Sequence, residues 1–311
     1  MQQKPTLSIA DTEPDLELFA GPNSDLPGPP LVATAFGVTD QGRVRVSNQD
    51  QFAVATLTSS LWIEQSSFPQ TRVQCGGTQG HLFIVADGLG GHAGGEQASK
   101  LAVEAVEAFL VQALGWLKQL QGQDAMLLEE LKSALQRADA EVMGKAAARP
   151  ELAAMGTTLT LACSIDDVLY IAHAGDSRCY LRRAKRLHQV THDHTFVGEL
   201  VSAGALDASA ARTHDLRHLV TNVVGGGRDG VRTEVHKVRL KREDVILLCT
   251  DGLTEMLPLD CIDSILESQR DPDAAAKRLV VAANEAGGSD NITALVARFD
   301  VRPAPAPRGS S

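Results

Sequence analysis

Two short apolar runs, each ending in an Asp-Gly pair, constrain the fold more than any other feature of the chain. The first is LFIVA, followed by Asp87 and Gly88, and the second is VILLCT, followed by Asp251 and Gly252. Apolar runs this short, rich in β-branched residues, are typical of interior strands. Each strand therefore carries a carboxylate to the edge of a buried core. Because the two carboxylates are far apart in sequence, the pattern predicts two strands that deliver ligands to one hard cation, and it favours a metal-dependent hydrolase.

Composition excludes several other classes of protein. The chain is 43% hydrophobic and 22% charged, which is typical of a soluble globular protein. Its net charge of -10 argues against a nucleic-acid partner, because phosphate contacts need clustered Lys and Arg. The five cysteines include no C-x-x-C pair, which favours a reducing compartment and no structural zinc. No apolar run approaches the ~20 residues of a membrane span, so we expect a cytoplasmic protein without a membrane segment.

The order of expected elements indicates one α+β domain. Residues 1–30 are rich in Pro, Asp and Gly and predict a flexible leader, and 301–311 predict a disordered tail. Between them, over 31–300, strands precede two helices, many strands, two more helices and a closing strand. This order lacks the regular alternation of a doubly wound parallel sheet. We therefore expect strands packed on strands, with helices outside.

Several local expectations are specific enough to be checked. Residues 44–46 read as a short strand, and Asp124 reads as the N-cap of the second helix. Asp271 followed by Pro272 predicts the start of the last helix. Residues 191–230 interrupt the strand pattern and predict one or two short helices with loops.

Five aspartates stand at strand edges or beside glycine. Singly, each could be an ordinary turn residue. Together they offer the oxygen ligands that suit Mg²⁺ or Mn²⁺ rather than zinc or copper. The five residues are Asp50, Asp87, Asp176, Asp251 and Asp290.

These aspartates lie in six sequence blocks that resemble the bacterial metal-dependent protein phosphatases, the PPM or protein phosphatase type 2C family. A lone Asp-Gly pair carries little information, whereas six blocks in the family's order are specific. The blocks are VRVSNQD at 44–50, VADGLGGHAGGEQAS at 85–99, GTTL at 156–159, AGDSR at 174–178, CTDGLT at 249–254 and GSDNIT at 288–293.

The resemblance implies a four-layer α-β-β-α sandwich with two central antiparallel sheets, and a site for two Mn²⁺ or Mg²⁺ ions. By matching position, Asp87 would bridge both ions and the Gly88 carbonyl would be a further ligand. Asp251 and Asp290 would complete the shell of one ion, and Asp50 would hold the other, largely through water. Asp176, with Asp251, matches a weaker third-metal site of bacterial members, although its carboxylate could instead pair with Arg178 or cap a turn.

Arg45 matches the arginine that binds the substrate phosphate in this family, with Arg43 as the alternative on the same face. The implied reaction is hydrolysis of phosphoserine and phosphothreonine by in-line attack of a water or hydroxide that bridges the two ions. Two adjacent ions can lower the pKa of such a water, and a guanidinium fork can hold two phosphoryl oxygens. No Cys or Ser nucleophile is then required.

One position departs from the family pattern. Many eukaryotic members have histidine after the Asp-Gly pair as a proposed general acid, and here that residue is Leu89. His92 is a candidate for the role, with a metal-bound water or no strong acid as alternatives. Residues 191–230 occupy the place of the variable flap beside the active site, where they would shape the choice of substrate. We interpret the four histidines in the flap as surface or cap residues rather than metal ligands; they are His192, His194, His214 and His218.

The expected partners are phosphoproteins, including substrates of a Ser/Thr kinase, and the expected state is a monomer. Two rival functions stay open because one fold supports many functions. The first is a catalytically inactive relative that uses the flap to bind phosphoproteins. The second is a phosphatase dedicated to a regulator of transcription, such as an anti-sigma antagonist.

Overall fold

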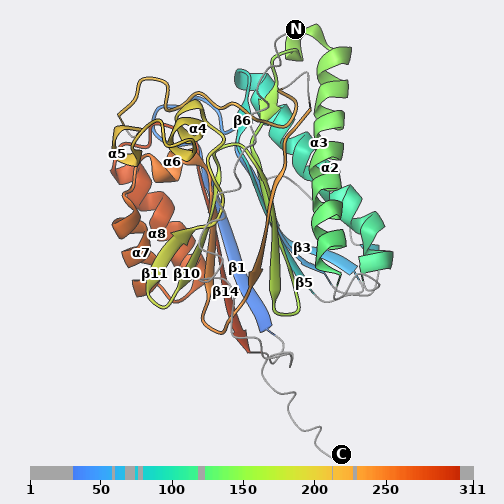
Figure 1. The fold of residues 1–311 in the computed structure, drawn as a ribbon, viewed down its shortest axis with the longest axis vertical. Coiled ribbons are helices and arrows are strands. Elements are labelled where there is room, and N and C mark those ends of the chain that lie inside the picture. Colours follow the sequence, from blue (N-terminus) through green and yellow to red (C-terminus); the bar gives the residue numbers. More distant parts are fainter. Residues whose placement is uncertain are drawn as a thin grey trace, which may run out of the picture.

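Two antiparallel sheets lie face to face between two pairs of helices in the computed structural model (Figure 1). The structure describes residues 31–57, 60–66, 74–75, 80–117, 123–211, 213–226 and 230–301. The predicted leader and all but the first residue of the predicted tail lie outside this part of the chain. The layering confirms the predicted α+β sandwich.

The larger sheet has seven strands in the order β12-β9-β8-β5-β2-β3-β4. Every paired neighbour in it runs antiparallel. The bounds are β2 (Gln51–Leu57), β3 (Ser60–Ser66), β4 (Gln74–Cys75), β5 (Gly80–Ala86), β8 (Leu159–Ile165), β9 (Val168–Ala174) and β12 (Glu234–Arg239).

The smaller sheet has five strands in the order β1-β14-β13-β10-β11, also antiparallel throughout. A separate two-stranded ribbon, β6-β7, lies at the upper end of the sandwich in Figure 1. The bounds are β1 (Leu31–Asp40), β10 (Arg178–Arg183), β11 (Arg186–Gln189), β13 (Val245–Cys249), β14 (Ile292–Val301), β6 (Gly88–Leu89) and β7 (Gly156–Thr157).

Two long helices cover the seven-stranded sheet, α2 (His92–Leu117) and α3 (Asp124–Ala148), and a 3-10 turn, η2 (Pro150–Leu152), follows them. On α3, the buried residues Leu127, Leu131 and Leu135 recur every fourth position, so one face of the helix packs on the sheet. The five-stranded sheet is covered by α7 (Leu259–Ser268) and α8 (Pro272–Glu285), with the short α6 (Asp251–Thr254) before them. No described helix is long and apolar enough to pass through a bilayer.

The core between the sheets explains why the central strands read as continuous apolar runs. Strand β13 is buried at every position because one face meets the opposite sheet and the other meets the helices. Phe83 of β5 and Phe299 of β14 pack edge to face across this layer, with ring centroids 6.3 Å apart. Side chains of both sheets thus interlock in one buried layer.

Most expected elements are confirmed, including the start of α8. The Asp271 side chain accepts a hydrogen bond from the backbone N–H of Ala274, and Pro272 is the first helical residue. The prediction for Asp124 is wrong in detail, because Asp124 is already helical and the N-cap is Gln123, which makes no side-chain cap. The Asp124 carboxylate instead accepts a hydrogen bond from the Tyr170 hydroxyl at 2.6 Å.

The predicted strand at 44–46 is also wrong. These residues form a bend, and Val44 and Val46 are 66% and 73% exposed. The Asn291 side-chain amide donates to the backbone carbonyls of Gln41 and Ser47, at 2.9 and 2.8 Å. The Asn291 side chain thus provides a hydrogen bond to a backbone carbonyl on each side of residues 44–46. The segment is therefore held without pairing to a neighbouring strand, and Arg45 projects from it.

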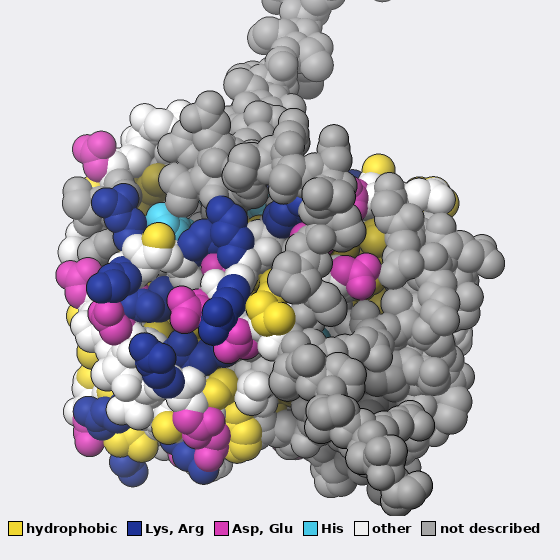
Figure 2. All heavy atoms as spheres, turned by 90° about the horizontal axis from the view of Figure 1, so that it is seen from below, with side chains coloured by type: hydrophobic (Ala, Val, Ile, Leu, Met, Phe, Trp, Pro, Cys, Tyr) yellow, Lys and Arg dark blue, Asp and Glu magenta, His cyan; other side chains and the backbone are white. Residues whose placement is uncertain are grey.

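The end of the sheets away from the short ribbon carries both signs of charge. Figure 2 shows Lys and Arg interspersed with Asp and Glu on this face. Ion pairs at the strand ends join Arg183 to Asp244 at 2.6 Å and Arg242 to Asp300 at 2.9 Å. Charge on the described part of this face is therefore mixed, not a basic patch of the kind that binds a nucleic-acid backbone.

We expect Phe83→Ala to lower the free energy of unfolding by about 3–5 kcal/mol, because it leaves a cavity in the layer between the sheets. The change should appear as a lower urea midpoint with an unaltered slope. Val281→Ala is the control: this side chain on α8 is 46% exposed, so its loss should cost less than about 0.5 kcal/mol. Equal effects of the two substitutions would contradict the described packing.

Candidate active site

The strand ends bring the predicted aspartates together at one end of the sandwich. Four of them line a cavity of about 480 Å³, and the fifth, Asp50, is buried beside it. The cavity also contains Arg45 and Gly88. The aspartates at its wall are Asp87, Asp176, Asp251 and Asp290.

Asp50 is held by two threonines that the sequence had not singled out. Its Oδ2 atom accepts hydrogen bonds from the hydroxyls of Thr250, at 2.8 Å, and Thr293, at 2.7 Å. Thr250 precedes Asp251 and Thr293 is the second residue of β14, so each lies in a block that also carries an aspartate. Both threonines therefore orient Asp50 while their own segments place the other carboxylates.

Glycines at this end allow loops to approach closely. A Cβ atom at Gly88 would lie 2.2 Å from the Gly95 carbonyl oxygen, and one at Gly252 would lie 2.0 Å from that of Asn291. Neither distance is sterically allowed. Glycine at these two positions therefore lets neighbouring backbone pack directly against the turns that carry Asp87 and Asp251.

The carboxylates repel one another and are largely buried from solvent. Burial raises the pKa of Asp50 to about 7, against the opposing hydrogen bonds from Thr293 and Thr250. Burial and the charge of Asp193 are the chief causes that raise the pKa of Asp176 to about 7. Loss of hydration and the neighbouring carboxylates also hold the pKa values of Asp87 and Asp251 well above their usual range.

Within the aspartate cluster, two buried carboxylate oxygens have no hydrogen-bond donor among the described residues, Oδ1 of Asp50 and Oδ1 of Asp251. A buried oxygen without a hydrogen-bond donor is costly, so these two oxygens are available to bind a cation. The only ion pair to a cavity aspartate within the described chain joins Arg45 Nη2 to Asp290 Oδ2 at 2.6 Å. Negative charge thus exceeds positive charge, and the all-oxygen donor set fits divalent cations such as Mg²⁺ or Mn²⁺.

Asp176 projects from a constrained turn between β9 and β10. Gly175 has φ +116°, and a Cβ atom there would lie 2.5 Å from Thr158 Cβ, so glycine is required. Arg178 does not form its ion pair with Asp176. It binds the Asp193 carboxylate with both Nε, at 2.8 Å, and Nη2, at 2.5 Å, which leaves Asp176 facing the cavity.

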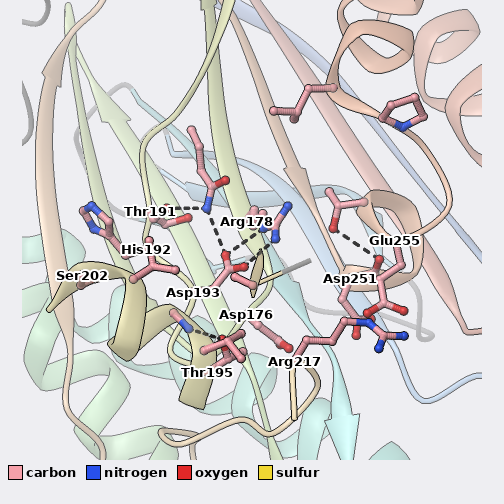
Figure 3. A pocket seen from close by; sticks show the side chains of 18 of the residues that line it. Asp176, Arg178, Thr191, His192, Asp193, Thr195, Ser202, Arg217, Asp251 and Glu255 are labelled. Carbon is pink, nitrogen blue, oxygen red and sulfur yellow. Dashed lines mark hydrogen bonds and ion pairs between the residues drawn. The ribbon is translucent and has the colours of Figure 1, made fainter. Parts of the chain in front are cut away.

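A second cavity of about 790 Å³ adjoins the first beneath the flap. The flap contains α4 (Phe196–Ser202) and α5 (Ala208–Ala211), as the sequence predicted short helices there. Both cavities are lined by Asp176, Asp251 and Glu255. Figure 3 shows Arg217 of the flap directed toward the end where Asp251 and Glu255 lie.

The structure shows where two of the histidines named from the sequence lie. His92 begins α2, but its side chain lies outside the described atoms. His218 of the flap lines the acidic cavity, and its Nδ1 atom lies 2.6 Å from Glu255 Oε1. Sequence reasoning named His218 only as a surface or cap residue, because a loop histidine carries no spacing signal that ties it to a distant strand end.

Comparison with known proteins agrees with this geometry. The sequence profile described as Protein phosphatase 2C matches residues 63–287. Serine/threonine phosphatase stp of Listeria monocytogenes is 31% identical over 264 residues, which cover 85% of this chain and 94% of that protein.

Solved structures share the fold. The Mycobacterium tuberculosis serine/threonine phosphatase PstP/Ppp superposes with a TM-score of 0.68 at 29% identity, covering 86% of this chain and 99% of that chain. The catalytic domain of PstP in complex with two manganese ions gives a TM-score of 0.65 at 29% identity, covering 87% and 99%. The profile match, the relatives and the strand-end aspartates agree: this chain belongs to the protein phosphatase 2C family, in its bacterial PPM form.

Proposed function

We propose that the protein is a metal-dependent serine/threonine phosphoprotein phosphatase. The observation that carries the proposal is the set of aspartates at one end of the sandwich, two of which have buried oxygens without donors. Such a site is poorly stabilised without cations, and it opens into cavities large enough to receive a phosphorylated side chain. The named activity of the relatives supports the same conclusion.

Different residues of the cluster would bind different cations. Asp87 and the Gly88 carbonyl would stand between two ions, Asp251 and Asp290 would complete one, and Asp50 would hold the other through water. Asp176, with Asp251, would form a third, weaker position. When bound, two Mn²⁺ or Mg²⁺ ions would supply an activated bridging water or hydroxide for in-line attack on phosphorus and neutralise charge on the phosphoryl oxygens.

Arg45 would bind and orient the substrate phosphate. Its side chain is 55% exposed and projects from the 44–46 bend into the cavity, where it now contacts Asp290. When Asp290 binds a metal cation, the Arg45 guanidinium can release the carboxylate oxygen and bind two phosphoryl oxygens instead. Arg43, the alternative, does not line this cavity.

Two histidines are candidates to assist the leaving serine or threonine oxygen. His92 stays a prediction from the sequence. His218 is the candidate that the structure adds, because it lines the cavity with Nδ1 held by Glu255 and so leaves Nε2 for a substrate oxygen. The flap that carries His218 and Arg217 would contact the substrate protein around its phosphorylated residue.

We further propose that the substrates are cytoplasmic phosphoproteins, including those modified by a Ser/Thr kinase, and that the protein acts as a monomer. Four cysteines, Cys163, Cys179, Cys249 and Cys261, are free thiols and the first three are buried, as suits a reducing compartment. A phosphatase dedicated to a transcription regulator would use the same site. An inactive phosphoprotein-binding relative is disfavoured because every aspartate of the proposed centre is present.

Binding of Mn²⁺ should release protons and strengthen with pH. In the ion-free protein Asp50 and Asp176 have pKa values of about 7, above the ordinary value near ~4. Between about pH 4 and 7 the native state therefore holds protons that the unfolded state has lost, so its stability falls as pH rises. Mn²⁺ must displace those protons, and its affinity should rise up to about tenfold per pH unit per proton over this interval.

Calorimetric titration at several pH values, in two buffers of different ionisation heat, measures both the affinity and the protons released. Asp50→Asn should release fewer protons than the natural protein. An affinity that stays constant from pH 5.5 to 7, without proton release, would contradict the electrostatic description of the site.

Asp251→Asn should keep the fold and lose Mn²⁺-dependent hydrolysis by roughly 10³-fold or more, because it removes a ligand carboxylate at nearly constant volume. The assay is turnover of a phosphothreonine peptide, with far-UV circular dichroism as the check on folding. Asp260→Asn, on the exposed first turn of α7, is the matched control and should retain full activity. A folded Asp251→Asn protein with normal turnover would remove Asp251 from the site.

Arg45→Ala should raise KM by about 10–100-fold, because a charge-assisted hydrogen bond contributes roughly 1.5–3 kcal/mol. Arg45→Lys should recover only part of this loss, since it restores the charge without the fork. Arg43→Ala tests the alternative and should leave KM unchanged. A higher KM in Arg43→Ala, with a normal KM in Arg45→Ala, would move the phosphate contact to Arg43.

A further inference from the structure

Four histidines surround the carboxylate of Glu234 at the root of the flap, beside the aspartate cluster but sharing no residue with it. Glu234 and His236 belong to β12, the outer strand of the seven-stranded sheet, which receives the chain after the flap. The start of the flap, between β11 and α4, supplies two histidines, and β9 supplies one more. The four are His173, His192, His194 and His236.

Three possible ligand atoms of this cluster, one each from His192, Glu234 and His236, lie within 4.8 Å of one another. Glu234 and His236 are two residues apart on a strand, so both side chains lie on the same face. Glu234 Oε1 lies 2.9 Å from His192 Nδ1 and also contacts His236 Nε2. Donors of a tetrahedral zinc ion are roughly 3.3 Å apart, given metal–ligand bonds of ~2.0–2.1 Å. A small outward movement would therefore make room for an ion among the three atoms.

The other oxygen of the carboxylate is already fixed. Glu234 Oε2 lies 3.1 Å from His194 Nε2. His194 Nδ1 accepts from the backbone N–H of Gly175, at 3.1 Å, and lies 3.0 Å from the Asn222 side-chain amide. Because Nδ1 is an acceptor, Nε2 carries the proton and donates to Glu234. A ligand held from behind by such a hydrogen bond is typical of metal sites.

The charge state suits a cation. Burial disfavours the Glu234 carboxylate, but hydrogen bonds from His192, His194 and His236 outweigh it and hold the pKa of Glu234 far below its usual range. His173 is not a ligand, because Nδ1 contacts the Thr160 hydroxyl and Nε2 the His192 carbonyl. Two imidazoles and one ionised carboxylate remain as donors.

We propose that His192 Nδ1, His236 Nε2 and Glu234 Oε1 form a second metal site, selective for Zn²⁺, with water as the fourth ligand. Two nitrogens and one oxygen favour Zn²⁺ over Mg²⁺ or Mn²⁺, which the all-oxygen centre prefers. His192 is 55% exposed, so an ion can enter from solvent. Binding replaces protons on the imidazole nitrogens and releases them to water.

The bound ion would tie the start of the flap to the strand that follows it. His192 lies just before α4, and Glu234 begins β12 directly after the flap. Through His194, the same cluster holds the backbone of Gly175, whose neighbour is Asp176. Zinc would therefore hold the flap and β12 together beside the active site, at a structural site that contains no cysteine.

The test is titration of the full chain with Co²⁺ and Zn²⁺ while excess Mg²⁺ occupies the aspartate centre. We expect one equivalent to bind with a Kd of about 10 µM or tighter, with the intense visible bands of four-coordinate Co²⁺. His192→Gln and His236→Gln should each weaken binding by at least about tenfold. Zinc should also raise Tm in the natural protein and not in His192→Gln.

His188→Gln is the matched control, since it removes a histidine of the neighbouring strand β11 outside the cluster, and it should bind as the natural protein does. Should His236→Gln fail to fold, the half-exposed His192 variant decides alone. Equal affinity in the natural protein and His192→Gln, or a single zinc site that disappears in Asp251→Asn, would overturn the proposal. Neither readout requires phosphatase activity.

Discussion

Mutual repulsion among carboxylates at one end of the sandwich is the constraint on which the rest of the site depends. Hydrophobic packing of the two sheets and their helices fixes the strand ends, and those ends hold Asp50, Asp87, Asp176 and Asp251 close together. The chain can tolerate this repulsion only because burial of the apolar core offsets it. The strain is local, and cations relieve it. An acidic protein can in this way bind an anionic phosphate, since the bound cations reverse the local charge.

The strands could be predicted well because their burial on both faces leaves a direct trace in the sequence. The apolar run of β13 predicts its bounds, and Asp271 with Pro272 predicts the start of α8. The segment at 44–46 misled prediction, because valines on either side of Arg45 resemble a strand while an asparagine 245 or more positions from them satisfies the bend. Side-chain bonds between distant segments leave no local pattern.

The site residues, like the fold, include some that a local sequence pattern predicts and some that depend on contacts between distant segments. Aspartates beside glycine at strand ends are visible in the sequence, whereas the threonines that orient Asp50 are not, since their role depends on how β13 and β14 pair beside it. The clustering of histidines around Glu234 was equally hidden. His192 and His236 are separated by the whole flap, and only the fold brings them to one carboxylate.

The most direct test of the account is hydrolysis of a phosphothreonine peptide by protein stripped of metal with EDTA, measured before and after Mn²⁺ is added back. The account predicts no turnover in the stripped protein and recovery on addition of Mn²⁺. Turnover that persists without metal would contradict the role given to the aspartates. A folded protein that stays inactive with either Mn²⁺ or Mg²⁺ would contradict the phosphatase function and favour a phosphoprotein-binding one.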